Sequence, residues 1–187
     1  MMQQISAQME IIMYRLLELP KLSKINHSEI DVYRRESEMV KDCITHHIYM
    51  FTIEEKLNNL FGFMVFVQFF GTTLNLCAVV YQLSKKSLNN VKFWSETGIL
   101  ICYILQIFMY CWSGDEMMTK SLGIVDAVYI MDWTLLTEET KKNLILMMVR
   151  ASRPIQLNGA TMITMSIATF LKILKASYSA FNLLRSL

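Results

Sequence analysis

The sequence predicts an all-α protein, a polytopic transmembrane helical bundle, and three observations predict it. Of its 187 residues, 53% are hydrophobic and only 18% are charged, whereas soluble domains average about 45–50% apolar and about 25% charged residues. Only two prolines and six glycines interrupt the chain. Three stretches contain no charged residue at all, and they lie between Lys56 and Lys85, between Glu96 and Asp115, and between Arg153 and Lys172. A helix of ~20 apolar residues crosses the ~30 Å hydrocarbon layer, so three spans are expected.

The N-terminal part predicts helices outside the membrane. Apolar residues recur there at helical spacing and predict an amphipathic helix ending near Pro20; they are Ile5, Met9, Ile12, Leu16 and Leu19. Residues 20–36 are polar and charged and predict a loop. From Glu38 to Lys56 the helical period returns and runs into the first uncharged stretch, which predicts one long helix emerging from the membrane.

The region after the second span mixes apolar and acidic residues and predicts neither a clear span nor a loop. Thr137 followed by Glu138 and Glu139 predicts a helix start, because Thr is a good N-cap and acids suit the first turn. Pro154 limits that helix. The expected layout is residues 1–59 as cytoplasmic helices and a loop, 60–83 as a transmembrane helix, 84–95 as an extracellular loop, 96–113 as a transmembrane helix, 114–155 as a cytoplasmic region, and 156–187 as the final transmembrane helix.

Charge predicts the orientation. Seven Lys and Arg precede the first span and five lie between the second and third spans, against four on the other side. The positive-inside rule then puts the N-terminal side in the cytoplasm and the C-terminus outside the cell. The net charge of +2 forms no basic stripe, so the expected partner is the lipid bilayer and no nucleic acid.

No pattern predicts an enzyme, a metal site or a cofactor. His46 and His47 are neighbours, which point in different directions on a helix and make a poor metal pair. Capping and solvation explain the adjacent acids of Asp115/Glu116 and Glu138/Glu139. The four cysteines have no C-x-x-C spacing and are expected to be free thiols. Residues 1–19 lack the features of a signal peptide, and the chain is expected to be a fragment or an incomplete gene product.

From about residue 95 to the end, the sequence resembles the insect odorant receptor family, and the match is weaker over residues 38–94. The matching blocks, in order, are Tyr110-Cys-Trp-Ser-Gly114, Ser121, Ala127, Tyr129, Trp133, Arg150-Ala-Ser-Arg-Pro154, Gly159-Ala160 and the final stretch from Ser166 to Leu184. Asn182 departs from the family, which usually has Thr there. The family has seven spans, and only its last three are present here.

The resemblance implies a subunit of an odorant-gated, non-selective cation channel. It implies a plasma-membrane hetero-tetramer with an odorant co-receptor subunit in olfactory neurons, gated by a volatile small molecule. The cytoplasmic region 114–155 would be an anchor region between subunits, with Tyr129, Asp132, Trp133 and Pro154 as contact candidates. The final helix would line the pore, with Tyr178, Leu183 and Ser186 as pore or gate candidates. The second span would add Gly98, Cys102 and Tyr103 to the odorant pocket.

Several of these residues have ordinary structural explanations that the sequence leaves open. Lys172 and Lys175 share a helix face and fall near the middle of the expected final span. They fit a polar route along the pore, or equally snorkelling or pairing with a neighbouring carboxylate. Leu183 fits simple packing as well as a gate. Asp132 and its aromatic neighbours fit solvated acids at a membrane edge as well as subunit contacts.

Two alternative functions remain at this point. A secondary transporter would use Lys172 and Lys175 as an anion site, although the inverted repeats and interrupted helices typical of transporters are not visible in the sequence. A truncated, non-functional receptor product is the other alternative. The odorant receptor subunit is the leading hypothesis.

Overall fold

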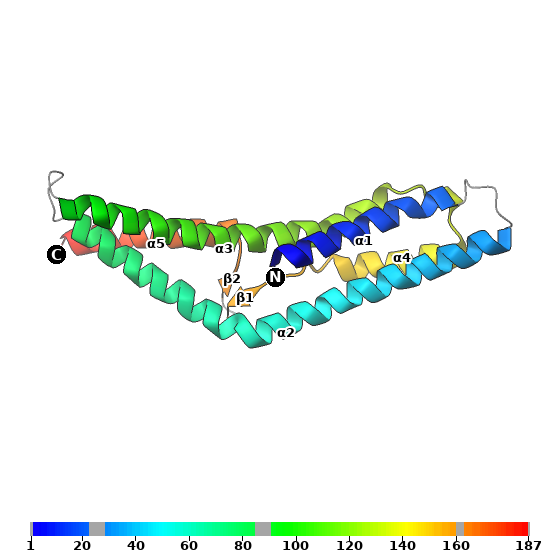
Figure 1. Cartoon of the computed structure of the whole chain (residues 1–187), viewed down its shortest axis with the longest axis horizontal. Coiled ribbons are helices and arrows are strands. Elements are labelled where there is room, and N and C mark those ends of the chain that lie inside the picture. Colours follow the sequence, from blue (N-terminus) through cyan, green and yellow to red (C-terminus); the bar gives the residue numbers. More distant parts are fainter. Residues whose placement is uncertain (1, 23–28, 85–90, 160–162, 187) are drawn as a thin grey trace. The chain divides into compact units, whose positions relative to one another are not determined.

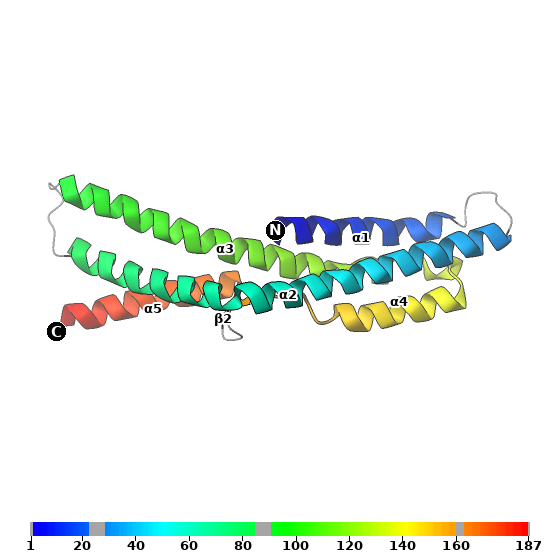
Figure 2. The same cartoon turned by 60° about the horizontal axis from the view of Figure 1, so that its bottom comes forward.

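The computed structural model describes residues 2–22, 29–84, 91–159 and 163–186. Its elements are the helices α1 (Met2–Leu22), α2 (Glu29–Ser84), α3 (Val91–Ile130), α4 (Glu138–Ala151) and α5 (Ile167–Ser186), a 3-10 turn at Trp133–Leu135, and the two short strands β1 (Asn158–Gly159) and β2 (Ile163–Thr164) (Figures 1 and 2). The prediction of an all-α protein is confirmed, apart from this small antiparallel hairpin.

The chain forms two compact units. Unit 1 consists of Met1–Lys56 and Glu116–Gln156, and unit 2 consists of Leu57–Asp115 and Leu157–Leu187. The long helices α2 and α3 contribute to both units. The sequence anticipated this for α2, whose 56 residues join the predicted extramembrane segment to the first span without a break.

Unit 1 is packed around a buried apolar core. All five apolar residues predicted to form one face of α1 are at most 4% exposed. On α3, Met117, Ser121, Ile124 and Val128 are buried at helical spacing, which explains why acidic residues alternate with apolar ones in this part of the sequence. Helix α1 lies alongside this segment of α3, and α4 lies alongside the first part of α2 (Figure 1).

Unit 2 leaves much of its apolar surface exposed. Leu60, Phe63, Met64 and Phe70 of α2 are each more than half exposed, and so are Trp94 and Leu105 of α3. Among the described residues, α2 and α3 are the two helices long and apolar enough to cross a membrane, and only 17% of each apolar window is buried inside the protein. A core helix of a soluble protein would be mostly buried, so these surfaces suit lipid.

Two predicted boundaries are wrong. The loop expected over residues 20–36 is largely helical, because α1 runs to Leu22 and α2 begins at Glu29. Asp31, Arg34 and Arg35 are exposed there, and Arg34 forms an i,i+4 ion pair with Glu38, whereas Glu36 is buried. The final helix, expected over residues 156–187, begins only at Ile167, because the hairpin occupies the preceding residues.

Candidate functional site

The start of α5 is fixed by polar contacts within unit 2. The Ser166 hydroxyl accepts a hydrogen bond from the Thr169 N–H, and the Thr169 hydroxyl donates to the Thr164 carbonyl at 2.7 Å. This is the N-cap arrangement expected of Ser at a helix start. The Ile167 N–H donates to the Asp115 carboxylate of α3. Ser166 and Thr169 are residue types that favour a helix start, but the uncharged run begins earlier in the sequence and predicts an earlier start.

The hairpin and the residue that follows it lie close to α2 and α3. The Asn158 N–H donates to the Asn58 side chain of α2 at 2.9 Å, and the Met165 N–H donates to the Leu157 carbonyl at the same distance. A Cβ atom added at Gly114 would lie 2.5 Å from the Met165 carbonyl oxygen. Only glycine therefore allows the backbone of α3 to approach the chain just before α5 so closely.

One side of α5 packs within unit 2. Phe170 meets Phe108 of α3 edge to face, with ring centroids 5.5 Å apart. Ser177 is 2% exposed, and its hydroxyl donates to the Ile173 carbonyl within the same helix. An internal hydrogen bond of this kind satisfies a hydroxyl that has left water.

The other side of α5 carries the predicted pore residues. Tyr178 is 66% exposed and Leu183 is 65% exposed, and Lys172 and Lys175 are exposed as well. A shallow hollow on this side is lined by Ala176, Ser179, Ala180, Asn182 and Leu183. The structure thus brings four of the five pore candidates to the exposed part of one helix; the side chain of the fifth, Ser186, lies outside the part of the chain that the structure describes.

The two lysines lie closer to the start of the helix than the sequence predicts. With Ile167 as the first helical residue, Lys172 is roughly 8 Å and Lys175 roughly 12 Å along the axis. The polar side chains of Asn58 and Asp115 bond to the backbone at this end of unit 2. Side chains on a helix lean toward its N-terminus, so Lys172 can extend its ammonium group toward the polar end rather than bury it at the centre of a span.

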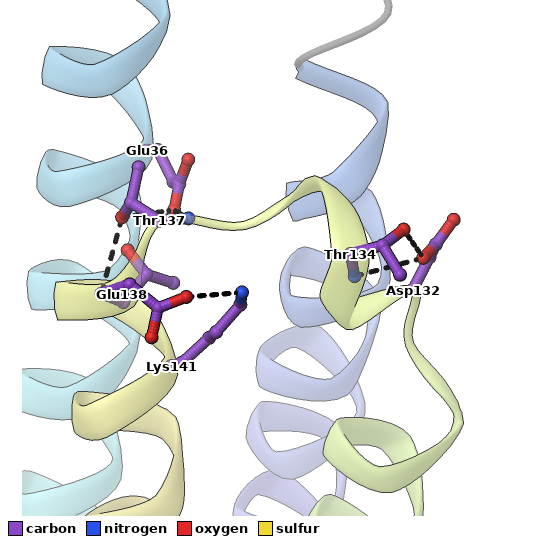
Figure 3. A network of polar contacts seen from close by, with 7 residues as sticks. Glu36, Asp132, Thr134, Thr137, Glu138 and Lys141 are labelled. Carbon is purple, nitrogen blue, oxygen red and sulfur yellow. Dashed lines mark hydrogen bonds and ion pairs between the residues drawn. The ribbon is translucent and has the colours of Figure 1, made fainter.

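Of the predicted subunit-contact residues of unit 1, Tyr129, Asp132 and Trp133 lie at the end of α3 and in the turn after it, whereas Pro154 follows the end of α4. Tyr129 is 76% exposed and Asp132 is exposed, whereas Trp133 and Pro154 are half-buried. Asp132 caps the 3-10 turn: its carboxylate accepts from both the N–H and the hydroxyl of Thr134 (Figure 3). Asp132 therefore has a local structural role beside any role between subunits.

Thr137 caps α4 as the sequence predicts. The structure also shows a hydrogen-bond acceptor for Thr137 that the sequence does not predict. The Glu36 carboxylate of α2 accepts hydrogen bonds from the N–H and from the hydroxyl of Thr137 (Figure 3). Glu36 is only 3% exposed. One turn earlier on α2, the Tyr33 hydroxyl donates to the Glu139 carboxylate at 2.5 Å. No pattern within residues 29–36 pointed to contacts with residues about a hundred positions later.

A buried histidine and a cation–π contact also join α2 to α4. The Arg150 guanidinium lies 3.6 Å from the centre of the Phe51 ring. The His47 ring packs edge to face against the Phe51 ring, with the two ring centroids 4.9 Å apart, and His47 is 2% exposed. Burial, the Arg150 charge and the His46 charge lower the pKa of His47 to about 4, so the imidazole is neutral at physiological pH.

The predicted odorant-pocket residues do not line the hollow on α5. Gly98 and Cys102 of α3 are exposed, and Tyr103 is half-buried. No atom would come within 4 Å of a Cβ added at Gly98. Gly98 and Cys102 are therefore exposed surface in this chain, whereas Tyr103 is partly covered.

No cofactor chemistry is suggested by the described residues. Across the residues that the structure places, no group of three or more His, Cys, Asp or Glu could hold a metal ion. Burial raises the pKa of the Cys43 thiol to about 11, which makes it a poor nucleophile at neutral pH.

Known proteins resemble this chain over most of its length. A family model described as 7tm Odorant receptor matches residues 1–178. Odorant receptor Or2 of Anopheles gambiae is 33% identical over 147 residues, which are 78% of this chain and 38% of that protein. Odorant receptor 10 of Aedes albopictus is 32% identical over 130 residues, which are 70% of this chain and 34% of that protein. The chain therefore spans little more than a third of the length of these relatives.

The fold is that of a solved insect olfactory receptor. Olfactory receptor OR5 from Machilis hrabei, in a structure with eugenol, superposes with a TM-score of 0.84 at 17% identity over 99% of this chain and 45% of that one. The odorant receptor coreceptor of Harpegnathos saltator is 24% identical over 145 residues, covering 78% of this chain and 30% of that protein. The family match and the two mosquito relatives carry the conclusion that this chain belongs to the insect odorant receptor family.

Proposed function

We propose that this chain is part of an odorant receptor subunit and supplies the pore-side helix of an odorant-gated, non-selective cation channel. Family membership favours this function over the transporter alternative. The observation that carries the proposal is the exposed side of α5, where Lys175, Tyr178, Ser179 and Asn182 lie beside Leu183.

The chemistry of this side of α5 suits water better than lipid. Charged and amide side chains in a span usually face a protein interior or an aqueous cavity, because hydrocarbon offers them no hydrogen-bond partners. The opposite side of α5 already packs through Phe170 and Ser177. A pore shared with other subunits would give the exposed polar side its water, and Leu183 would narrow the pore as an apolar constriction.

The proposed orientation follows from the charge distribution. We propose that unit 1 is cytoplasmic and that the C-terminal end of α5 is extracellular, in the plasma membrane of olfactory neurons. In that orientation Leu183 lies near the outer mouth of the pore. The odorant, a volatile small molecule, would bind in the outer part of the bundle near Gly98, Cys102 and Tyr103, and would shift the channel toward the open state by binding that state more tightly.

Unit 1 offers a surface for contact between subunits. Ile145, Leu146 and Val149 of α4 are each more than half exposed, and Tyr129 and Ile130 are about three-quarters exposed. Exposed apolar residues on an extramembrane unit favour protein contacts. We propose that this surface, with Asp132, Trp133 and Pro154 nearby in sequence, is the anchor contact in a hetero-tetramer with a co-receptor subunit.

The experiment is a current measurement on the full-length receptor. It would be co-expressed with an odorant co-receptor subunit, and cation current would be recorded under a panel of volatile odorants. The proposal predicts an odorant-evoked current that requires both subunits. Surface-expressed receptor that gives no current to any odorant, or that carries out saturable substrate uptake instead, would contradict it.

A further inference from the structure

A groove in unit 2 runs between α2, the hairpin and α5. Its volume is about 570 Å³, and its walls include Phe69, Phe70 and Thr73 of α2, Thr164 of the hairpin, and Lys172 and Ile173 of α5. The groove belongs to unit 2 alone. It adjoins the exposed hollow around Leu183 on the same helix, because Ala176 lines both.

Lys172 is the charged residue among those that line this groove. It is exposed, and among the described residues no carboxylate forms an ion pair with it. Another charged group near the start of α5 is the Asp115 carboxylate, which accepts a hydrogen bond from the Ile167 N–H. An ammonium group near a membrane surface is attracted to the negative headgroups of anionic lipids.

The rest of the lining is divided between hydroxyl groups and apolar side chains. Thr164, Ser166 and Thr169 lie at the end where α5 begins, where the Thr169 hydroxyl donates to the Thr164 carbonyl and accepts from the Ser166 hydroxyl. Phe69, Phe70 and Ile173 supply the apolar walls. Polar groups at the membrane face and apolar groups deeper match a molecule with a charged head and a hydrocarbon tail.

We propose that this groove binds an anionic phospholipid of the leaflet at which α5 begins, with the phosphate against Lys172 and an acyl chain along Phe69, Phe70 and Ile173. Lys172 extends toward that membrane face because helical side chains lean toward the N-terminus. A neutral lipid would lack the net attraction that an anionic headgroup has for this ammonium group. The inference requires only that unit 2 lies in a bilayer, and it holds whether or not the channel conducts.

Lys175 provides a matched control. It lies on the same helix three residues later and is exposed, yet it does not line the groove. The full-length receptor would be placed in phosphatidylcholine nanodiscs that contain a small fraction of phosphatidylglycerol carrying a photoreactive acyl chain. After illumination, the labelled peptides would be identified by mass spectrometry.

The proposal predicts labelling of the peptides around Phe69–Phe70 and Ile173, in preference to labelling by the same probe on phosphatidylcholine. Lys172→Ala should reduce this labelling about fivefold, as expected for the loss of one Lys–lipid attraction near a membrane surface. Lys172→Arg should retain it, and Lys175→Ala should leave it unchanged.

Other outcomes would overturn the proposal. Equal labelling by the anionic and neutral probes would show no headgroup preference, as would equal losses in the Lys172→Ala and Lys175→Ala variants. Absence of label at the groove, with label on other lipid-facing peptides, would mean that protein covers it. Displacement of the lipid probe by millimolar inorganic phosphate would assign the site to a free anion instead.

Discussion

The carboxylate of Glu36 accepts hydrogen bonds from the Thr137 N–H at 3.1 Å and from the Thr137 hydroxyl at 3.0 Å, although 101 residues separate the two. The same Thr137 hydroxyl accepts from the Thr140 N–H at 3.4 Å and so caps α4. One buried carboxylate on α2 therefore fixes the first turn of α4, the helix whose exposed apolar side is proposed to meet another subunit.

Removing this carboxylate should loosen unit 1. Glu36→Ala leaves a buried N–H and a hydroxyl without their acceptor, which costs about 1–3 kcal/mol. The thermal unfolding temperature of the detergent-solubilised receptor should fall accordingly. Glu38→Ala is the matched control, because the Glu38 side chain is 63% exposed and pairs with Arg34 at the surface. Equal effects of the two substitutions would contradict the capping role of Glu36.

A methyl group at Gly114 should displace the chain before α5. Gly114→Ala would place a Cβ 2.5 Å from the Met165 carbonyl oxygen, and overpacking of this kind costs typically 1–3 kcal/mol. Gly98→Ala, on the same helix with nothing within 4 Å, should be neutral or stabilising. Surface expression and thermal stability of both variants test this. A Gly114→Ala receptor as stable as the Gly98→Ala receptor would show that the backbone can separate at no cost.

Acid should destabilise unit 1 through His47. The pKa of His47 is about 4 in the folded chain and about 6.5 when unfolded. Between these values the unfolded chain binds a proton that the folded chain rejects, so stability falls as pH drops from 6.5 toward 4, by about 3 kcal/mol at most. His47→Gln should flatten this part of the stability–pH curve, whereas the half-buried His46 should contribute less when replaced by Gln. An unchanged slope in His47→Gln would refute the assignment.

The charge at Lys175 should limit cation flow. If α5 borders the pore, Lys175→Gln removes a positive charge from the path of the permeating cation, so single-channel conductance should rise. Lys175→Arg keeps the charge and should leave conductance close to that of the unsubstituted receptor. Patch-clamp recording of the three receptors at low ionic strength, where screening is weakest, gives the clearest comparison. Identical conductance in all three would place Lys175 away from the pore.

The helices were predictable wherever one local signal determined them. The spacing of Ile5, Met9 and Ile12 gave the buried face of α1, and Thr137 with its following acids gave the start of α4. The predicted helix boundaries were wrong where a contact between distant segments determines the structure. Glu36 occupies an inward position where the apolar pattern would need a hydrophobic residue, and the polar, charged sequence of residues 20–36 predicts a loop where the first turns of α2 lie.

The site was predictable in part. The uncharged final stretch predicted one helix for Lys172 and Lys175, and the resemblance added Tyr178 and Leu183 as candidates; the structure places all four on the exposed part of α5. The depth of the two lysines depended on where α5 starts. That start depends on Asn58, Asp115 and Gly114, which approach the hairpin from other helices. An uncharged run alone does not contain this information.

The most direct test of the central claim asks whether Leu183 faces an aqueous pore. In the full-length receptor with its co-receptor subunit, Leu183→Cys would be treated from outside the cell with a charged, membrane-impermeant thiol reagent during odorant stimulation. Ser177→Cys, at the buried side of the same helix, is the control. The account predicts that the reagent blocks odorant-evoked current through Leu183→Cys and leaves the Ser177→Cys and unsubstituted receptors unaffected. Full current in treated Leu183→Cys receptors, with the cysteine shown to be unmodified, would contradict it.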